Sequence, residues 1–180
     1  MKHLCLLALA SCAAAQAATG GDTRPEPVNV VVETGQDVGA CPDGGTLGYP
    51  AQAYKGTSYF LLKADPVLAS RHMKATQRQA PWLQRLDGPS GANRLYTGAD
   101  GTQVVVFSVC KPAACSSSSA YGAYAVPTQA YAIELQESGK PGTVLGTETP
   151  PLQAAIACTR SIDQRVREAA VQAARVPAHP

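Results

Sequence analysis

Cys110 and Cys115, separated by four residues, stand at the end of the most strand-like run in this sequence. That run, residues 102–109 (TQVVVFSV), is β-branched and apolar enough to form a buried strand, whereas the serines at 116–119 are too polar for a core. The pattern predicts that a rigid strand delivers residues 110–115, which we call the stapled loop, to the surface. A disulfide between the two cysteines closes only a small ring and removes little entropy from the unfolded chain. Its value is to fix the loop before the loop enters a partner's cleft.

Residues 1–18 have the pattern of a secretory signal peptide, with a short basic start, the apolar stretch 4–10 (LCLLALA) and small residues suited to cleavage. The apolar stretch is far too short to span a bilayer. We therefore expect an exported protein. A rival interpretation is that residues 9–12 (LASC) form a bacterial lipobox, in which case Cys12 carries lipid and anchors the protein to a membrane.

Four cysteines follow the predicted leader: Cys41, Cys110, Cys115 and Cys158. In an oxidising compartment an even number favours disulfides, and of the three pairings we favour Cys110 with Cys115 and Cys41 with Cys158. The second bond would stabilise the fold by roughly 4 to 5 kcal/mol in the chain-entropy model. A zinc site is less favoured because no cysteine pair has the spacing of zinc modules. The two-residue spacing of a thioredoxin-like redox motif is absent.

The chain divides into the leader 1–18, a segment 19–56 and one domain at 57–175. Segment 19–56 is rich in Gly, Pro and Asp, which predicts a mobile or irregular structure, with an edge strand at 28–33 and one anchor at Cys41.

Within the domain, helix and strand signals succeed one another. Asp65 and Pro66 predict the start of a surface helix that runs to about Gln79. From residue 152 to residue 175 the Ala-rich pattern predicts one long helix or two shorter ones, with its arginines on a solvated face. Short β-branched or alternating runs predict strands at 94–97, 102–109, 121–126, 130–135 and 143–147. The sum is an α+β domain, an antiparallel sheet flanked by helices.

Residues that support catalysis are scarce. After the leader the only histidines are His72, which we predict to be exposed on the surface helix, and His179 in the tail. The sequence has no nucleophile elbow, P-loop or dinucleotide-binding fingerprint. We therefore expect no enzyme activity, no metal site and no cofactor. The formal charge is only +2, and no basic run interleaves with aromatic residues, so we expect no nucleic-acid partner.

The order of these features resembles that of the Ivy family, inhibitors of vertebrate lysozyme from Gram-negative bacteria. The resemblance covers roughly residues 57–175, through APWL at 80–83, a short strand, a turn and TQVVVFSVCKPAAC at 102–115, followed by two alternating strands. Its most specific part is CKP with a second cysteine three residues later, carried by Cys110, Lys111, Pro112 and Cys115.

The resemblance implies a periplasmic protein with a sheet of about five antiparallel strands flanked by helices, often a homodimer, with the stapled loop protruding from one edge. It also implies that this loop plugs the active-site cleft of a c-type lysozyme. Some members of the family are linked to control of the bacterium's own lytic transglycosylases. Such clefts hold catalytic carboxylates, so a donor on a rigid loop can bind them while excluding substrate.

The sequence departs from the family at the tip of the loop, where Ala113 and Ala114 replace the usual His and Asp. Truncating an interface hot spot to Ala typically costs about 2 to 4 kcal/mol, roughly 30-fold to 1000-fold in affinity. Lys111 remains as a cation, and the slimmer tip suits a narrower cleft. We expect an inhibitor of peptidoglycan-cleaving glycosidases, either c-type lysozyme or lytic transglycosylase. The alternative is an envelope interaction module that has lost inhibition.

Overall fold

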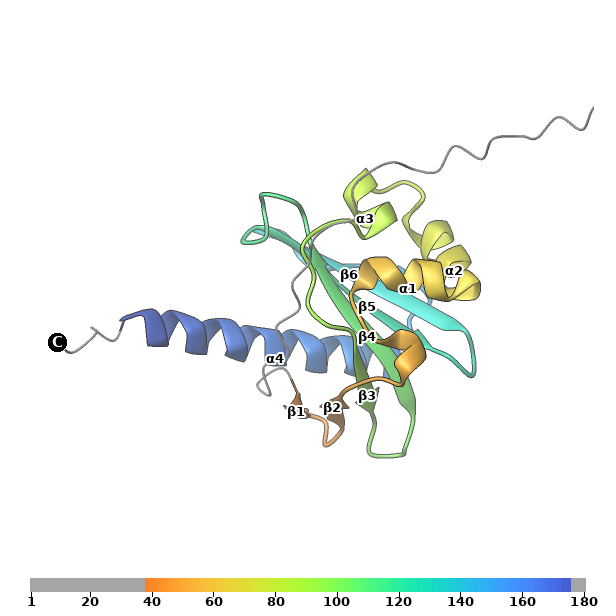
Figure 1. Ribbon diagram of the computed structural model, residues 1–180, viewed down its shortest axis with the longest axis horizontal. Coiled ribbons are helices and arrows are strands. Elements are labelled where there is room, and N and C mark those ends of the chain that lie inside the picture. Colours follow the sequence, from red (N-terminus) through yellow and green to blue (C-terminus); the bar gives the residue numbers. More distant parts are fainter. Residues whose placement is uncertain (1–37, 176–180) are drawn as a thin grey trace, which may run out of the picture.

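A computed structural model describes residues 38–175 and confirms the α+β fold (Figure 1). Within this range seven antiparallel strands pair in sequence order to form one sheet. Helix α4 packs on one face of the sheet and helices α1–α3 pack on the other. The strands are β1 (Gly39–Ala40), β2 (Thr46–Gly48), β3 (Arg94–Thr97), β4 (Gln103–Cys110), β5 (Ser118–Ala125), β6 (Ala130–Glu137) and β7 (Thr143–Gly146). The helices are the 3-10 turn η1 (Gln52–Tyr54), α1 (Ser58–Ala64), α2 (Pro66–Thr76), α3 (Pro81–Arg85) and α4 (Pro150–Arg175).

The sheet has more strands than the five or so that were expected, because β1 and β2 form within the segment 19–56. They contain only two and three residues. Strand β2 pairs with β3, and its Leu47, opposite Tyr96, is buried in the core. Strands this short contain too few residues for an alternating pattern, so hydrophobic periodicity does not reveal them.

Strand β4 is buried on both faces over residues 104–107, which explains the unbroken apolar run there. Val104 and Val106 belong to the core cluster under α4. Val105, Phe107 and Val109 belong to the cluster under α1–α3. Layers of helix on both sides of a strand require apolar side chains at every position rather than at alternate ones.

The second half of β4 is paired on one side by a segment that is not a strand. Strand β3 pairs β4 only as far as Val106. Beyond it, Ser90 forms an isolated bridge with Val109, and the Cys110 N–H donates to the Pro89 carbonyl at 2.8 Å. A Cβ atom at Gly88 would collide with the Cys110 carbonyl, so this close approach requires glycine. The base of the stapled loop is therefore held from both sides.

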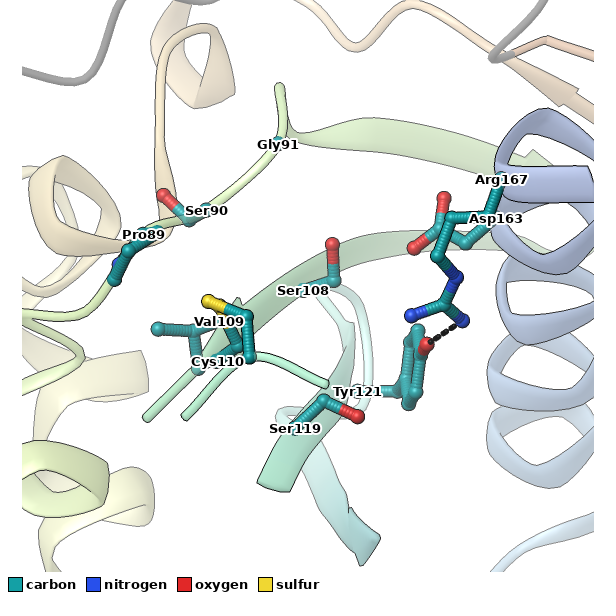
Figure 2. A pocket seen from close by; sticks show the side chains of 11 residues that line it. Pro89, Ser90, Gly91, Ser108, Val109, Cys110, Ser119, Tyr121, Asp163 and Arg167 are labelled. Atoms are coloured by element: carbon teal, nitrogen blue, oxygen red, sulfur yellow. Dashed lines mark hydrogen bonds between the residues drawn. A yellow bond between two sulfur atoms is a disulfide. The ribbon is translucent and has the colours of Figure 1, made fainter. Parts of the chain in front are cut away.

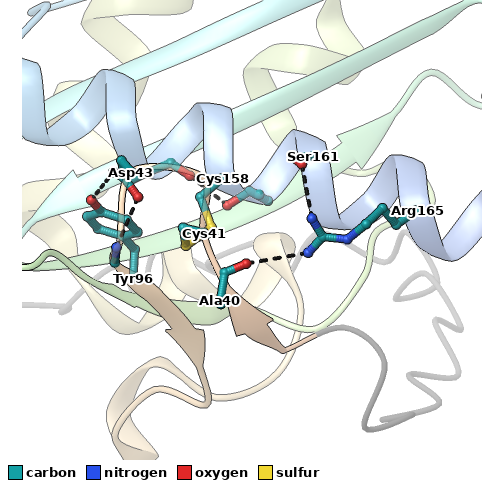
Figure 3. The surroundings of a disulfide bond; sticks show 10 residues. Ala40, Cys41, Asp43, Tyr96, Cys158, Ser161 and Arg165 are labelled. Carbon is teal, nitrogen blue, oxygen red and sulfur yellow. Dashed lines mark hydrogen bonds between the residues drawn. A yellow bond between two sulfur atoms is a disulfide. The ribbon is translucent and has the colours of Figure 1, made fainter.

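Helix α4 is fastened to the start of the described chain by the Cys41–Cys158 disulfide, which confirms the predicted long-range pairing (Figure 3). The bond joins residues 117 positions apart. In the same corner the Tyr96 hydroxyl donates to the Asp43 carboxylate. Burial first, and then this hydrogen bond and the charge of Asp43, raise the pKa of Tyr96 to about 12.

Helix α2 begins as the sequence predicts. The Asp65 carboxylate accepts hydrogen bonds from the Val67 and Leu68 N–H groups at 2.9 and 3.0 Å, with Pro66 as the first helical residue. The helix ends at Thr76, three residues before the expected end. This difference is of the size usual for helix ends read from a sequence pattern.

The prediction that His72 is exposed is wrong, because the side chain is 0% exposed. Helix α2 packs against α3, β6 and β7, and His72 lies on the packed face. Its Nε2 lies 2.9 and 3.0 Å from the carbonyl oxygens of Leu83 and Gln84, and its Nδ1 lies 2.6 Å from the Tyr131 hydroxyl. Carbonyls only accept, so Nε2 carries the proton of a neutral imidazole and Nδ1 accepts from Tyr131.

Several expectations concern residues outside the described range. These are the leader 1–18, lipidation of Cys12, the strand at 28–33 and the tail that contains His179. Among residues 38–175 no helix is both long and apolar enough to cross a membrane. In the same residues no three side chains of His, Cys, Asp or Glu gather closely enough to hold a metal ion.

His72 makes stability depend on pH. Burial lowers the pKa of His72 in the folded state. Below the unfolded value of about 6.5, the unfolded chain therefore binds a proton that the folded chain does not bind. We expect the free energy of unfolding to fall as the pH falls below about 6.5, by up to about 1.4 kcal/mol per pH unit.

Urea unfolding at pH values between 5 and 8 measures this slope. The His72→Gln variant should be less stable throughout and should lose this part of the pH dependence. Equal slopes in the two proteins would contradict the assignment.

Candidate functional site

The stapled loop joins β4 to β5 and is closed covalently. The Cys110–Cys115 disulfide is formed, as predicted, with the two Cα atoms 4.8 Å apart. At the root of the loop, the Lys111 N–H donates to the Ser118 carbonyl at 3.0 Å and so continues the β4–β5 pairing by one step. The Ser118 N–H donates to the Ala114 carbonyl at 2.9 Å, which ties the ring to the start of β5.

A tight turn shapes the tip of the loop. The Ala114 N–H donates to the Lys111 carbonyl at 3.0 Å, which places Pro112 and Ala113 at the two central positions. Ala113 has φ +59°, a left-handed conformation that is uncommon for a residue with a Cβ atom. Because proline cannot adopt positive φ, this is the type II arrangement, in which Gly or Asn usually occupies the second central position.

The tip presents two alanine methyl groups and one cation. Lys111, Pro112 and Ala113 are exposed and Ala114 is half-buried. A hydrogen bond and the charge of Lys140 lower the pKa of Glu137, and the charge of Lys111 lowers it further. Lys111 therefore lies within electrostatic reach of the end of β6. The loop extends away from the helical layers at this end of the sheet (Figure 1).

A cavity of about 250 Å³ lies beside the loop, between residues 89–91, the ends of β4 and β5, and α4 (Figure 2). A second and larger depression of about 710 Å³ adjoins it. Together we call these two spaces the polar hollow, because they share the lining residues Cys115, Ser119, Tyr121 and Arg167. The other hydroxyl and amide side chains that line it include Ser90, Ser108, Gln136 and Gln164.

Helix α4 contributes a charged face to the polar hollow. Arg160, Asp163, Gln164 and Arg167 have the spacing that places side chains on one face of a helix. Arg160 pairs with Glu134 of β6 at 2.6 Å. The sequence interpretation of the arginines as a solvated face is therefore incomplete, because two of them line a concave site.

Two further contacts hold this face in place. Asp163 pairs with the buried Arg94 of β3 at 2.8 Å. The Arg167 guanidinium donates to the Tyr121 hydroxyl at 3.1 Å, and Figure 2 shows Arg167 and Asp163 side by side next to α4, with Tyr121 below them. The arrangement can bind a small polar ligand, since charged, hydroxyl and amide groups converge on it.

The six predicted loop residues are consecutive and lie together in the stapled loop. Tyr121, Asp163 and Arg167 line the hollow and Arg94 pairs with Asp163, but none of the four was predicted from the sequence as part of a site. The helical spacing of Arg160, Asp163, Gln164 and Arg167 is a signal that was available in the sequence. Arg94 gave no such signal, because a lone arginine at the start of a short strand is usually exposed.

Comparison of the chain with protein-family models, with curated proteins and with solved structures found no match. These comparisons assign no family to the chain. We therefore infer the function from the geometry of the stapled loop.

The left-handed conformation of Ala113 yields a stability prediction. Replacing Ala113 by glycine removes a steric cost of about 1 to 2 kcal/mol from the folded state, because glycine adopts positive φ freely. Glycine also makes the unfolded chain more flexible, which lowers the free energy of unfolding by about 0.4 to 1 kcal/mol. We expect Ala113→Gly to raise the free energy of unfolding by roughly 0.5 to 1 kcal/mol in urea denaturation.

Ala114→Gly is the matched control. The backbone of Ala114 is not among those with positive φ, so only the entropic cost applies and stability should fall. Equal destabilisation by the two glycines would refute the strained-turn account.

Proposed function

We propose that this protein is an exported inhibitor of peptidoglycan-cleaving glycosidases, a c-type lysozyme or a lytic transglycosylase. It acts by inserting the stapled loop into the active-site cleft. The observation that carries the proposal is an exposed, disulfide-closed loop at the end of a strand that is buried on both faces.

The loop has the rigidity that insertion requires. Its root is held by the Pro89 carbonyl on one side and by β5 on the other. Its tip is fixed by the turn at Pro112 and Ala113. A loop that is already ordered loses less conformational entropy on binding, so more of the contact energy remains as affinity.

Lys111 supplies the charge that a glycosidase cleft attracts. Retaining and inverting glycosidases use a pair of carboxyl groups that flank the scissile bond. The exposed ammonium of Lys111 lies at the start of the tip and can form a charge-assisted hydrogen bond with one of them. The loop would then occupy the space that the sugar chain needs.

The two alanines at the tip of the loop indicate which enzyme the protein would inhibit more strongly. Ala113 and Ala114 offer no side-chain donor or acceptor, so the tip contributes shape and backbone groups alone. Loss of a hot-spot side chain costs about 30-fold to 1000-fold in affinity. We therefore propose that a narrower cleft, such as that of a lytic transglycosylase, is a better target than the cleft of a c-type lysozyme.

Two disulfides support the proposed compartment. Bonds such as Cys41–Cys158 and Cys110–Cys115 form and persist in oxidising environments. This supports export to the periplasm, where peptidoglycan-cleaving enzymes act. We propose a binding role there rather than a catalytic one.

A second candidate is an envelope interaction module that keeps the scaffold and no longer inhibits. The observation that favours it is the same alanine tip. In this case the loop serves as a structural closure of the β4–β5 hairpin.

We predict that the exported protein slows cell-wall lysis, and more strongly with a lytic transglycosylase than with a c-type lysozyme. Turbidity loss of a cell-wall suspension measures the rate. Lys111→Ala should raise the inhibition constant about tenfold or more, because a charge-assisted hydrogen bond contributes about 1.5 to 3 kcal/mol.

Lys55→Ala is the matched control, since Lys55 is another exposed lysine but lies outside the loop. It should leave inhibition unchanged. The Ala113→His, Ala114→Asp double variant tests the tip and should strengthen inhibition of c-type lysozyme. If the native protein inhibits neither enzyme while the double variant inhibits lysozyme, the interaction-module candidate replaces the inhibitor proposal.

A further inference from the structure

We propose that the polar hollow binds a small hydroxylated carboxylic acid of the sugar-acid class, with Arg167 holding the carboxylate. This site is separate from the tip of the stapled loop and does not depend on the proposed function. The size of the hollow, the positive charge that remains after its ion pairs are counted and its polar lining side chains favour such a ligand.

The hollow has the dimensions of a small-molecule site. Its smaller part, about 250 Å³, is bounded by Ser90, Ser108 and Ser119 and by α4 (Figure 2). Its larger part, about 710 Å³, continues past residues 116–119 to the end of β6. Ligand sites of proteins typically occupy about 300 to 1,000 Å³. The larger part lies within this range and the smaller part just below it, so the two adjoining parts have room for one sugar-sized group.

The charges in the hollow leave one positive group available. Asp163 is neutralised by Arg94 at 2.8 Å, and Arg160 by Glu134 at 2.6 Å. The Glu137 carboxylate pairs with Lys140 at 2.8 Å. Among residues 38–175 no carboxylate forms an ion pair with Arg167.

Arg167 is also oriented before any ligand arrives. Its guanidinium donates one hydrogen bond to the hydroxyl of Tyr121, whose side chain is itself buried. A guanidinium carries five N–H donors, so several remain for a ligand. Their planar geometry matches the two oxygens of a carboxylate. The helix that carries Arg167 is fixed by the Cys41–Cys158 bond, so the donor group is preorganised.

The remaining lining groups suit a ligand rich in hydroxyls. Serine hydroxyls and glutamine amides can each both donate and accept hydrogen bonds, as sugar hydroxyls do. Ser108 and Ser119 line the smaller part from adjacent strands, and Gln136 and Gln164 line the larger part. Each glutamine donates one N–H to a glutamate, and a second N–H and the amide oxygen remain on each side chain.

A monoanion fits this charge better than a phosphate. A phosphate group at neutral pH carries up to two negative charges and is usually bound by several cations or by a helix N-terminus. The hollow offers the single uncompensated charge of Arg167, and the lining contributed by α4 comes from the middle of that helix. A carboxylate matches that one charge.

The proposal is tested by titrating the full exported protein separately with D-glucuronate, D-glucose, acetate and inorganic phosphate. Binding is measured at each step from the NMR chemical shifts of the backbone amides. We expect saturable shifts with glucuronate at Ser108, Ser119, Tyr121 and Arg167. Glucuronate should bind about tenfold or more tightly than either glucose, which lacks the carboxylate, or acetate, which lacks the hydroxyls.

Arg167→Gln should weaken glucuronate binding about 10-fold to 100-fold, the effect of losing a hydrogen bond to a charged group. Arg165→Gln is the matched control, because Arg165 contacts Ser161 and the Ala40 carbonyl and does not line the hollow (Figure 3). Tyr121→Phe removes only the hydroxyl that orients Arg167 and should weaken binding by a smaller factor, about 3-fold to 10-fold.

Four results would overturn the proposal. They are the absence of saturable shifts with glucuronate, equal binding of glucuronate and acetate, tighter binding of phosphate than of glucuronate, and unchanged glucuronate affinity in a folded Arg167→Gln protein. The amide spectrum of each variant reports directly whether it is folded. Absence of glucuronate binding would not change the result expected in the lysis assay, because the stapled loop contributes only Cys110 and Cys115 to the lining of the hollow.

Discussion

Burial of β4 between two layers of helices positions everything else in this molecule. The strand brings Val104 and Val106 to α4 and Val105, Phe107 and Val109 to α1–α3, so a shift of register would displace both sets from their packing partners. Where β4 leaves the core it becomes the root of the stapled loop. The position of the loop is therefore fixed by the strand that packs on both of its faces. This fixed root holds the small ring in one place.

Helix α4 is the second element on which the site depends. Its first half packs through apolar side chains such as Leu152, Ile156 and Ile162, and Cys158 fastens it to the β1–β2 corner. Farther along, the face changes from apolar to charged, and Asp163 meets the buried Arg94. Arg94 is buried and Asp163 is partly exposed, so removing Asp163 would leave a buried guanidinium without this carboxylate, which is unfavourable. The pair therefore helps to hold α4 over the sheet.

The stapled loop and the polar hollow are neighbours with opposite chemistry. The loop tip presents methyl groups and one lysine, whereas the hollow presents hydroxyls, amides and a guanidinium. Cys115 is the wall between them, since it closes the loop and lines both parts of the hollow. A partner that receives the loop would therefore come close to the hollow, although each surface is suited to its own kind of contact.

The sequence alone was sufficient for the features that short-range patterns carry. The Asp65 cap, the apolar run of β4 and the stapled loop are local, and the order of helix and strand signals indicated the α+β class. The Cys41–Cys158 pairing was the favoured one of three possible pairings. Tertiary structure decided the features that depend on contacts between segments far apart in the sequence. His72 is buried because α2 packs on α3, β6 and β7, and β1 and β2 are strands only because β3 pairs with them. Arg94 and Asp163 lie in segments far apart in the sequence, and so do Tyr121 and Arg167, so no local pattern joins either pair. The loop was readable from the sequence because its residues are consecutive, and the hollow was not because its residues come together only when α4 lies across the sheet.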